Sequence, residues 1–89
     1  MSENFAIDGT LVDFKRRTLP GNPDTLVVRD EAGNDYKLEC NANFKDNEII
    51  FGYGDMTKKV MLGNKADIRV HTERSYSTSR LILRAINLH

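Results

Sequence analysis

TLVVRDEAGNDYKLEC, residues 25–40, contains the clearest structural signal in the chain. Apolar residues occupy every second position from Tyr36 to Cys40 and alternate with lysine and glutamate, which is typical of a half-buried strand. Residues 25–30 form a second run that is rich in β-branched and apolar side chains. Between the two runs, residues 31–34 form a short turn with a late glycine, a hairpin loop that ends in a left-handed residue. The stretch therefore predicts a β-hairpin with strands over 25–30 and 35–41.

The segment before the hairpin predicts a long, bent strand. Apolar or small residues alternate from Phe5 to Leu11, and then the pattern slips, because Val12 and Phe14 continue it on the other parity. A slip close to Gly9 is typical of a β-bulge or a sharp bend. A strand of this kind serves two sheets or turns the corner of a barrel. The loop LPGNPD, residues 19–24, ends the strand with a tight Pro-Gly turn.

Two more strands are predicted towards the C-terminus. From Ala66 to Thr72, apolar residues again take every second position, with Ala66, Ile68 and Val70 inward. The stretch TERSYSTSR, residues 72–80, then forms a polar loop into a last strand from Ser79 to about Leu88. That strand is not cleanly two-faced. One face has Leu81, Leu83 and Ala85, and the other has Arg80, Ile82, Arg84 and Ile86.

Residues 42–57 are open to two interpretations. We favour a short helix that is capped by Asn43 and ended by the glycines of FGYGDM, residues 51–56. The alternative is a further strand over Glu48–Tyr53.

The order of these elements resembles the OB-fold, a small Greek-key barrel with a bent first strand and an interruption between the third and fourth strands. The ending LILRAINLH, residues 81–89, is similar to the final strand of single-strand-binding and primosomal OB proteins. The predicted fold class is all-β, with one short helix and a single five-stranded, OB-like domain over residues 1–89. A small barrel of the SH3 type and an open meander with one helix are the alternatives.

The composition indicates one ordinary globular domain. The chain has 89 residues, of which 39% are hydrophobic and 29% charged. Cys40 is the only cysteine, so an intrachain disulfide is impossible, and with only two histidines we expect no metal and no cofactor. The start of the chain lacks the features of a signal peptide, and no apolar run approaches the roughly twenty residues of a membrane span. We therefore expect a cytoplasmic protein in a reducing compartment.

The net charge is zero, but the charges are unevenly distributed along the chain. Residues 1–55 contain 6 Lys and Arg against 11 Asp and Glu, a balance of −5, and residues 56–89 contain 7 against 2, a balance of +5. If this separation persists in space, the molecule has a basic side that can meet an anionic partner. An ordinary mixed surface is the other interpretation.

Two basic segments fall on the loops that flank the binding face of an OB-fold. Guanidinium and ammonium groups bind phosphates and release counterions, and an exposed tyrosine can stack on a base. The resemblance thus implies a site for single-stranded DNA or RNA. The loop residues assigned to it are Lys15, Arg16, Arg17, Arg74, Tyr76 and Arg80. The outward residues expected to line the sheet between the loops are Lys37, Arg69, His71 and Arg84, with Phe14 and Tyr53 as further stacking candidates.

The same residues have plainer explanations. The Lys-Arg-Arg run at 15–17 would also serve as a solvated gatekeeper at a strand end, and Tyr76 could fold back over the barrel mouth. The runner-up function is a protein-interaction module, for example a phage- or plasmid-type accessory or inhibitor protein that binds a host protein, and the charge split favours it. A homodimer through an exposed edge, or through Ile82, Ile86 and Leu88, is also compatible with the sequence.

Catalytic signatures are absent from the sequence, so we expect a non-enzymatic binding module. His71 has no nucleophilic serine motif with it, and Cys40 alternates with core residues. The acidic residues lack the spacing of a calcium loop, and the glycines of FGYGD, residues 51–55, lack the rest of a phosphate-binding motif.

Overall fold

The computed structural model describes the backbone of residues 2–53 and 56–88 and the side chains of residues 3–51 and 58–88. The described part of the chain has eight strands and no helix. It accordingly contains no helix that is long and apolar enough to cross a membrane. The strands are β1 (Ser2–Lys15), β2 (Asp24–Asp30), β3 (Asp35–Cys40), β4 (Asn43–Lys45), β5 (Glu48–Tyr53), β6 (Met56–Met61), β7 (Lys65–Ser75) and β8 (Thr78–Leu88).

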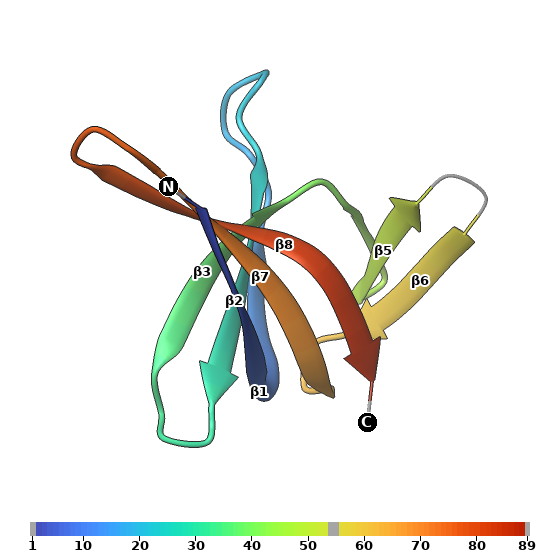
Figure 1. Ribbon diagram of the computed structural model, residues 1–89. Helices are drawn as coiled ribbons and strands as arrows, with labels where there is room; N and C mark the ends of the chain where they lie inside the picture. Colours follow the sequence, from blue (N-terminus) through green and yellow to red (C-terminus); the bar gives the residue numbers. More distant parts are fainter. Residues whose placement is uncertain (1, 54–55, 89) are drawn as a thin grey trace.

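Five of the strands close into a ring in the order β1-β2-β3-β8-β7 (Figure 1). The long β1 pairs antiparallel with β7 along its first part and with β2 along its second. β2 pairs with β3, and β7 with β8, in the same sense. A parallel contact between β3 and β8 completes the ring through one registered pair, Glu39 and Ile82. The all-β prediction is confirmed, and the five principal strands expected from the sequence are the five of the ring.

The predicted bend of β1 is confirmed at the predicted place. The pairing with β2 shifts register between Leu11 and Asp13, which is a β-bulge. Just before it, Gly9 pairs with Asp30 on β2 and with Ala66 on β7. A Cβ atom at position 9 would lie 2.4 Å from the carbonyl oxygen of Arg29. Glycine is needed here because the backbone of β2 approaches β1 too closely for a side chain.

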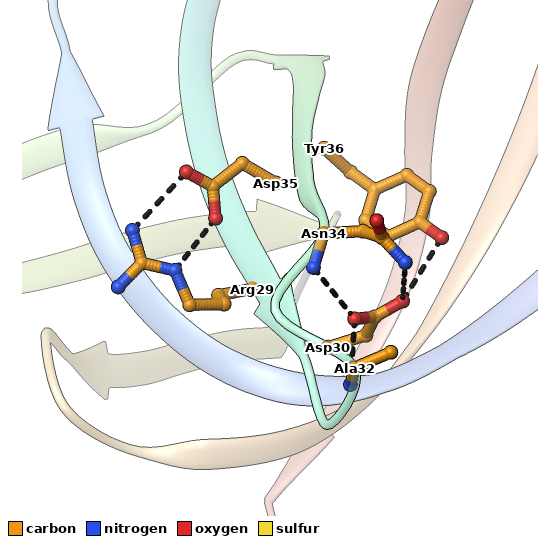
Figure 2. Close-up of polar contacts among 6 residues, drawn as sticks. All are labelled: Arg29, Asp30, Ala32, Asn34, Asp35 and Tyr36. Carbon is orange, nitrogen blue, oxygen red and sulfur yellow. Dashed lines mark hydrogen bonds and ion pairs between the residues drawn. The ribbon is translucent and has the colours of Figure 1, made fainter.

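The β2–β3 hairpin is also confirmed, and a carboxylate organises its turn (Figure 2). Gly33 has a φ of 86°, the left-handed residue that was predicted. The Asp30 carboxylate accepts hydrogen bonds from the backbone N–H groups of Ala32 (3.0 Å) and Asn34 (2.9 Å) and from the hydroxyl of Tyr36 (3.1 Å). The bonds from Asn34 are the largest cause of a lowered Asp30 pKa. The turn is thus held most firmly while this carboxyl is ionised.

Between β3 and β7 the chain forms a second sheet in the order β4-β5-β6, so the predicted short helix is wrong and the alternative strand over Glu48–Tyr53 is correct. Ile49 and Phe51 are both buried, which is the two-residue period of a strand. The two residues that join β4 to β5, Asp46 and Asn47, have φ of 54° and 65°. A type I′ turn requires positive φ at both positions, and Asp and Asn tolerate it better than most residues. The local backbone chemistry therefore favours a hairpin over a helix.

The second sheet is part of the core. Ile49, Phe51 and Val60 belong to the same buried cluster as the side chains inside the ring. The ring of Phe44 on β4 stacks on that of Phe14 on β1, with centroids 5.3 Å apart. The insertion between the third and fourth ring strands therefore packs its apolar side chains into the same core as the ring.

The last two ring strands confirm one predicted face and correct another. Ala66, Ile68 and Val70 are buried as predicted. The inward face of β8 differs from the prediction. Arg69 of β7 pairs with Ala85, and the next β7 residue, Val70, pairs with Leu83. Arg84, which lies between these two partners, therefore bulges out of the ladder. Because of the bulge, the positions of β8 that face the core shift by one residue. Leu83 and Ile86 are consequently the buried residues of β8, and Ile86 is not available for the dimer contact proposed from the sequence.

Candidate nucleic-acid interface

The two basic loops project from the same end of the ring, as the predicted rim requires. In Figure 1 the β1–β2 connection rises at the top and the β7–β8 hairpin extends to the upper left, whereas the β2–β3 turn lies at the opposite end. Segments about sixty residues apart in sequence thus reach the same side of the fold.

The base of the β1–β2 loop is fastened to the chain that follows β3. The buried carboxylate of Asp24 accepts hydrogen bonds from the backbone N–H groups of Arg17 (2.9 Å) and of Ala42 (3.4 Å), the residue just before β4. The guanidinium of Arg16 donates to the carbonyl oxygen of Phe44 at 2.6 Å. Among the described residues, the charged groups of Lys15 and Arg17 have no partner. Arg16 therefore braces the loop, and Lys15 and Arg17 are the cations it offers to a ligand.

The β7–β8 hairpin is longer than predicted and carries a fully exposed tyrosine at its tip. β7 continues to Ser75 and β8 starts at Thr78, so only Tyr76 and Ser77 remain as the turn. Tyr76 has a φ of 57° and its side chain touches nothing that would bury it. Thr78 closes the turn by donating its hydroxyl hydrogen to the carbonyl oxygen of Ser75 (2.8 Å). Tyr76 has therefore not folded back over the ring.

Arg80, assigned to the site from the sequence, is an internal brace. Its guanidinium forms a two-bond pair with the Glu39 carboxylate on β3, at 2.8 and 3.0 Å, and lies 3.7 Å from Glu73. The bond to Glu39 is the main cause of a raised pKa for Arg80. Because the β3–β8 contact has one registered residue pair, this ion pair helps to close the ring where its backbone pairing is weakest. Arg74, by contrast, has no partner within the described part of the chain.

The residues expected between the loops separate into two places. Lys37 points outward from β3, is exposed, and has no partner among the described residues. Arg69 and His71 lie on the outer face of β7 beside β1, and Arg84 lies on the neighbouring bulge of β8. The structure therefore brings Lys37 to the ring face of β2 and β3, and gathers the other three on the adjoining face.

The remaining stacking candidates do not add to the rim. Phe14 is partly buried against the core and stacked on Phe44, and the side chain of Tyr53 lies outside the described residues. Sequence reasoning missed Leu19, which is exposed in the β1–β2 loop. It also missed the partners of Arg80. A two-residue turn at 76–77 would by itself have placed Glu73 opposite that arginine.

Metal and thiol chemistry find no support in the described residues. Nowhere in them do three or more His, Cys, Asp or Glu side chains gather as metal ligands. Burial, followed by the charge of Asp24, raises the pKa of the Cys40 thiol to about 12. The thiol is therefore protonated and unreactive at neutral pH.

Comparisons with protein-family models, with curated proteins and with solved structures gave no match to this chain. Its function must therefore be inferred from the site itself.

Proposed function

We propose that this protein is a small, non-enzymatic module of the OB type that binds single-stranded DNA or RNA at the end of the ring where its two basic loops project. The observation that carries the proposal is the joint exposure, at that end, of unpaired cations and of a tyrosine with no structural role. The free, buried Cys40 thiol is consistent with a reducing, cytoplasmic location.

The strand order supports the OB comparison. The first ring strand pairs with both the second and the fourth, and the third closes against the fifth, as in a five-stranded Greek-key barrel. The β4-β5-β6 insertion occupies the interval between the third and fourth ring strands. In OB-folds the ligand lies on the face of the second and third strands, between the loops that correspond here to β1–β2 and β7–β8.

The charges on the loops and on the β2–β3 face suit a phosphate backbone. Four cations on or between the loops have no partner among the described residues, so their charges are available to an anion. Each phosphate that such a group neutralises releases counterions, and this release is the main source of affinity for nucleic acid. The four residues are Lys15, Arg17, Lys37 and Arg74.

Tyr76 supplies the contact to a base. A left-handed backbone costs a residue with a Cβ atom roughly 1–2 kcal/mol, which is why turns of this kind usually contain glycine or asparagine. Tyrosine gains nothing within the chain in return, because its ring is fully exposed. An exposed, positioned aromatic ring stacks on a base with roughly 1–3 kcal/mol, so a ligand explains a residue that folding does not.

Fluorescence anisotropy with labelled oligo-dT and a labelled mixed-sequence RNA tests the proposal. Four phosphate contacts predict that log K falls with log salt at a slope of about −2.8, or about 50-fold between 50 and 200 mM salt. Tyr76→Ala should weaken binding about 5- to 150-fold, the equivalent of one lost stacking contact. Arg74→Ala should weaken binding and make the salt slope shallower by about 0.7.

Lys65→Ala is the matched control for these variants. Lys65 is exposed, and its ammonium group has no partner among the described residues. Its backbone lies opposite Thr10, at the bend of β1 and away from both loops. Its loss should leave the affinity almost unchanged. Absence of any anisotropy change at micromolar protein and low salt would overturn the proposal.

A protein-interaction module is the second candidate, and one observation favours it. Leu19 in the β1–β2 loop is 63% exposed, and it joins Tyr76 as an apolar group on the projecting loops. Two apolar side chains flanked by arginines suit the centre and rim of a protein interface. This candidate predicts no oligonucleotide binding at physiological salt, and it predicts that a specific partner protein is lost on Leu19→Ser.

A further inference from the structure

A second basic surface lies outside the loops. It is a depression of about 490 Å³ on the outer face of β1, β7 and β8. Residues of three neighbouring strands line it, so both ends of the sequence contribute. These are Asn4, Phe5, Ala6, Arg69, Val70, His71 and Arg84.

Arg84 is directed into this depression by its bulge. The ladder between β7 and β8 passes from Ala85 to Leu83 without pairing Arg84. A bulge adds local twist and re-aims the side chain that it carries. The Arg84 guanidinium is exposed, and no described residue binds it. A cation that the backbone re-aims and that no acid neutralises is suited to an external anion.

Arg69, His71 and Asn4 are the other polar residues that line the depression. Arg69 forms a long hydrogen bond and an ion pair with Asp67 at 3.4 Å, and its side chain is mostly exposed. His71 is held in place, because its Nδ1 lies 2.8 Å from the side-chain oxygen of Asn4. Glu73 lies at the edge, 3.7 Å from the imidazole, and is shared with Arg80. Among the described residues, Arg84 is therefore the guanidinium of the depression that no acid neutralises.

The depression continues towards the loops through Arg84. The same residue lines a neighbouring hollow of about 320 Å³ over the β3–β8 contact. That hollow also contains Pro23 at the end of the β1–β2 loop, and Glu39 and Arg80, which neutralise one another. A nucleic-acid strand that leaves the loop region by this route crosses the neutral Glu39–Arg80 ion pair and then meets the unpaired Arg84.

We propose that the depression is a second phosphate-binding site for the same single strand, which leaves the loops, crosses β8 and places a phosphate between Arg84 and Arg69. This inference rests on the proposed function. From Thr78 to Arg84 is six residues along β8, roughly 20 Å at the rise of a strand. The distance makes the second site reachable by a longer oligonucleotide only, within the range of about 4–16 nucleotides that single OB-folds cover.

The test compares oligo-dT of about 5 and about 15 nucleotides on the full chain, with Arg84→Ala, Arg69→Ala and the Lys65→Ala control. For the long oligonucleotide, each arginine variant should make the salt slope shallower by about 0.7, which corresponds to about 5-fold weaker binding at 0.1 M salt. The short oligonucleotide should bind both variants as it binds the wild type. Thermal melts of each variant establish that it is folded, and two arginines on different strands guard against a local structural effect.

Two results would overturn the inference while leaving the proposed function intact. Either both oligonucleotides bind the arginine variants as well as the wild type, or both lose affinity to the same degree. If the wild type binds neither oligonucleotide, the proposed function fails, and the second site fails with it.

Discussion

Gly9→Ala tests the closure of the ring at the residue where β1 leaves one neighbour for the other. The new Cβ atom would lie 2.4 Å from the carbonyl oxygen and 3.0 Å from the carbonyl carbon of Arg29. Both are backbone atoms in a paired strand, so they cannot swing aside as a flexible side chain would. Overpacking of this kind costs about 1–3 kcal/mol. We expect the upper part of that range, because Gly9 is paired on both sides, to Asp30 and Ala66.

The sign of the effect is diagnostic. Replacing a glycine with alanine at an unstrained, uncrowded site stabilises the protein by about 0.4–1 kcal/mol, because the unfolded chain loses conformational entropy. A loss of about 2–3 kcal/mol instead corresponds to a fall in Tm of about 8–24 °C for a domain of this size. Urea unfolding and thermal melts followed by circular dichroism measure both quantities.

Gly21→Ala is a control that changes the backbone strain without introducing a steric clash. Gly21 has a φ of 89°, but a Cβ there would meet nothing within 4 Å. Its replacement should cost only the left-handed strain of roughly 1–2 kcal/mol. A Gly9→Ala protein that is as stable as the wild type, or more stable, would refute the close approach of β1 and β2 and with it the bend that closes the ring.

Three further predictions concern stability and reactivity. Hydrogen bonds lower the pKa of Asp30 in the folded chain, so the unfolded chain takes up the proton first as the pH falls, and stability should decline below about pH 4. Asp30→Asn should make this decline shallower in urea titrations from pH 6 to 2.5. Parallel curves for the variant and the wild type would contradict the assignment. The Cys40 thiol, with its pKa raised to about 12, should resist a thiol reagent at pH 8 until urea unfolds the chain, whereas immediate labelling would show that it is accessible. Phe51→Ala should cost about 3–5 kcal/mol in urea unfolding, because Phe51 is a fully buried member of the core; a loss below about 1 kcal/mol would mean that β5 packs loosely against the ring.

The parts of the fold that the sequence predicts are those with a local cause. The period of Tyr36 to Cys40 and the late Gly33 together define the hairpin, since a two-residue period and a left-handed turn position are both readable from neighbours. The parity slip after Leu11 marks the bend for the same reason. In each case the signal and the structure it determines lie within a few residues of one another.

The parts that the sequence did not predict depend on weaker or distant causes. The Asp46-Asn47 turn has no glycine, so it is a weaker hairpin signal than Asn-Gly, and the short apolar run after it suits a helix as well as a strand. The bulge at Arg84 follows from the register of β7 against β8, which no local pattern of β8 reveals. The closure of β3 on β8 is parallel and joins residues about forty positions apart, so the Glu39–Arg80 pair could not be derived from spacing.

Charge distribution along the chain proves a poor guide to the charges that a ligand would meet. Arg80 comes from the basic C-terminal part and Glu39 from the acidic N-terminal part, and folding joins them into a neutral pair. Lys58, also from the basic part, donates to the carbonyl oxygen of Ile86 and to the side chain of Asn87. Folding thus neutralises or occupies charges that the sequence counts as free.

The unpaired cations of the loops and of the β2–β3 face come from both parts of the chain. Lys15, Arg17 and Lys37 belong to the stretch whose balance is −5, and Arg74 belongs to the stretch whose balance is +5. What a phosphate chain would recognise is this local excess and not the overall dipole, because screening at physiological salt limits exposed charges to a range of about 8 Å. Removing one of these four should therefore change the salt slope of binding, whereas removing the exposed Lys65 at the other end should not. A slope that followed net charge alone, and fell equally in Arg74→Ala and Lys65→Ala, would place the recognition in the overall field of the molecule instead of in its loops.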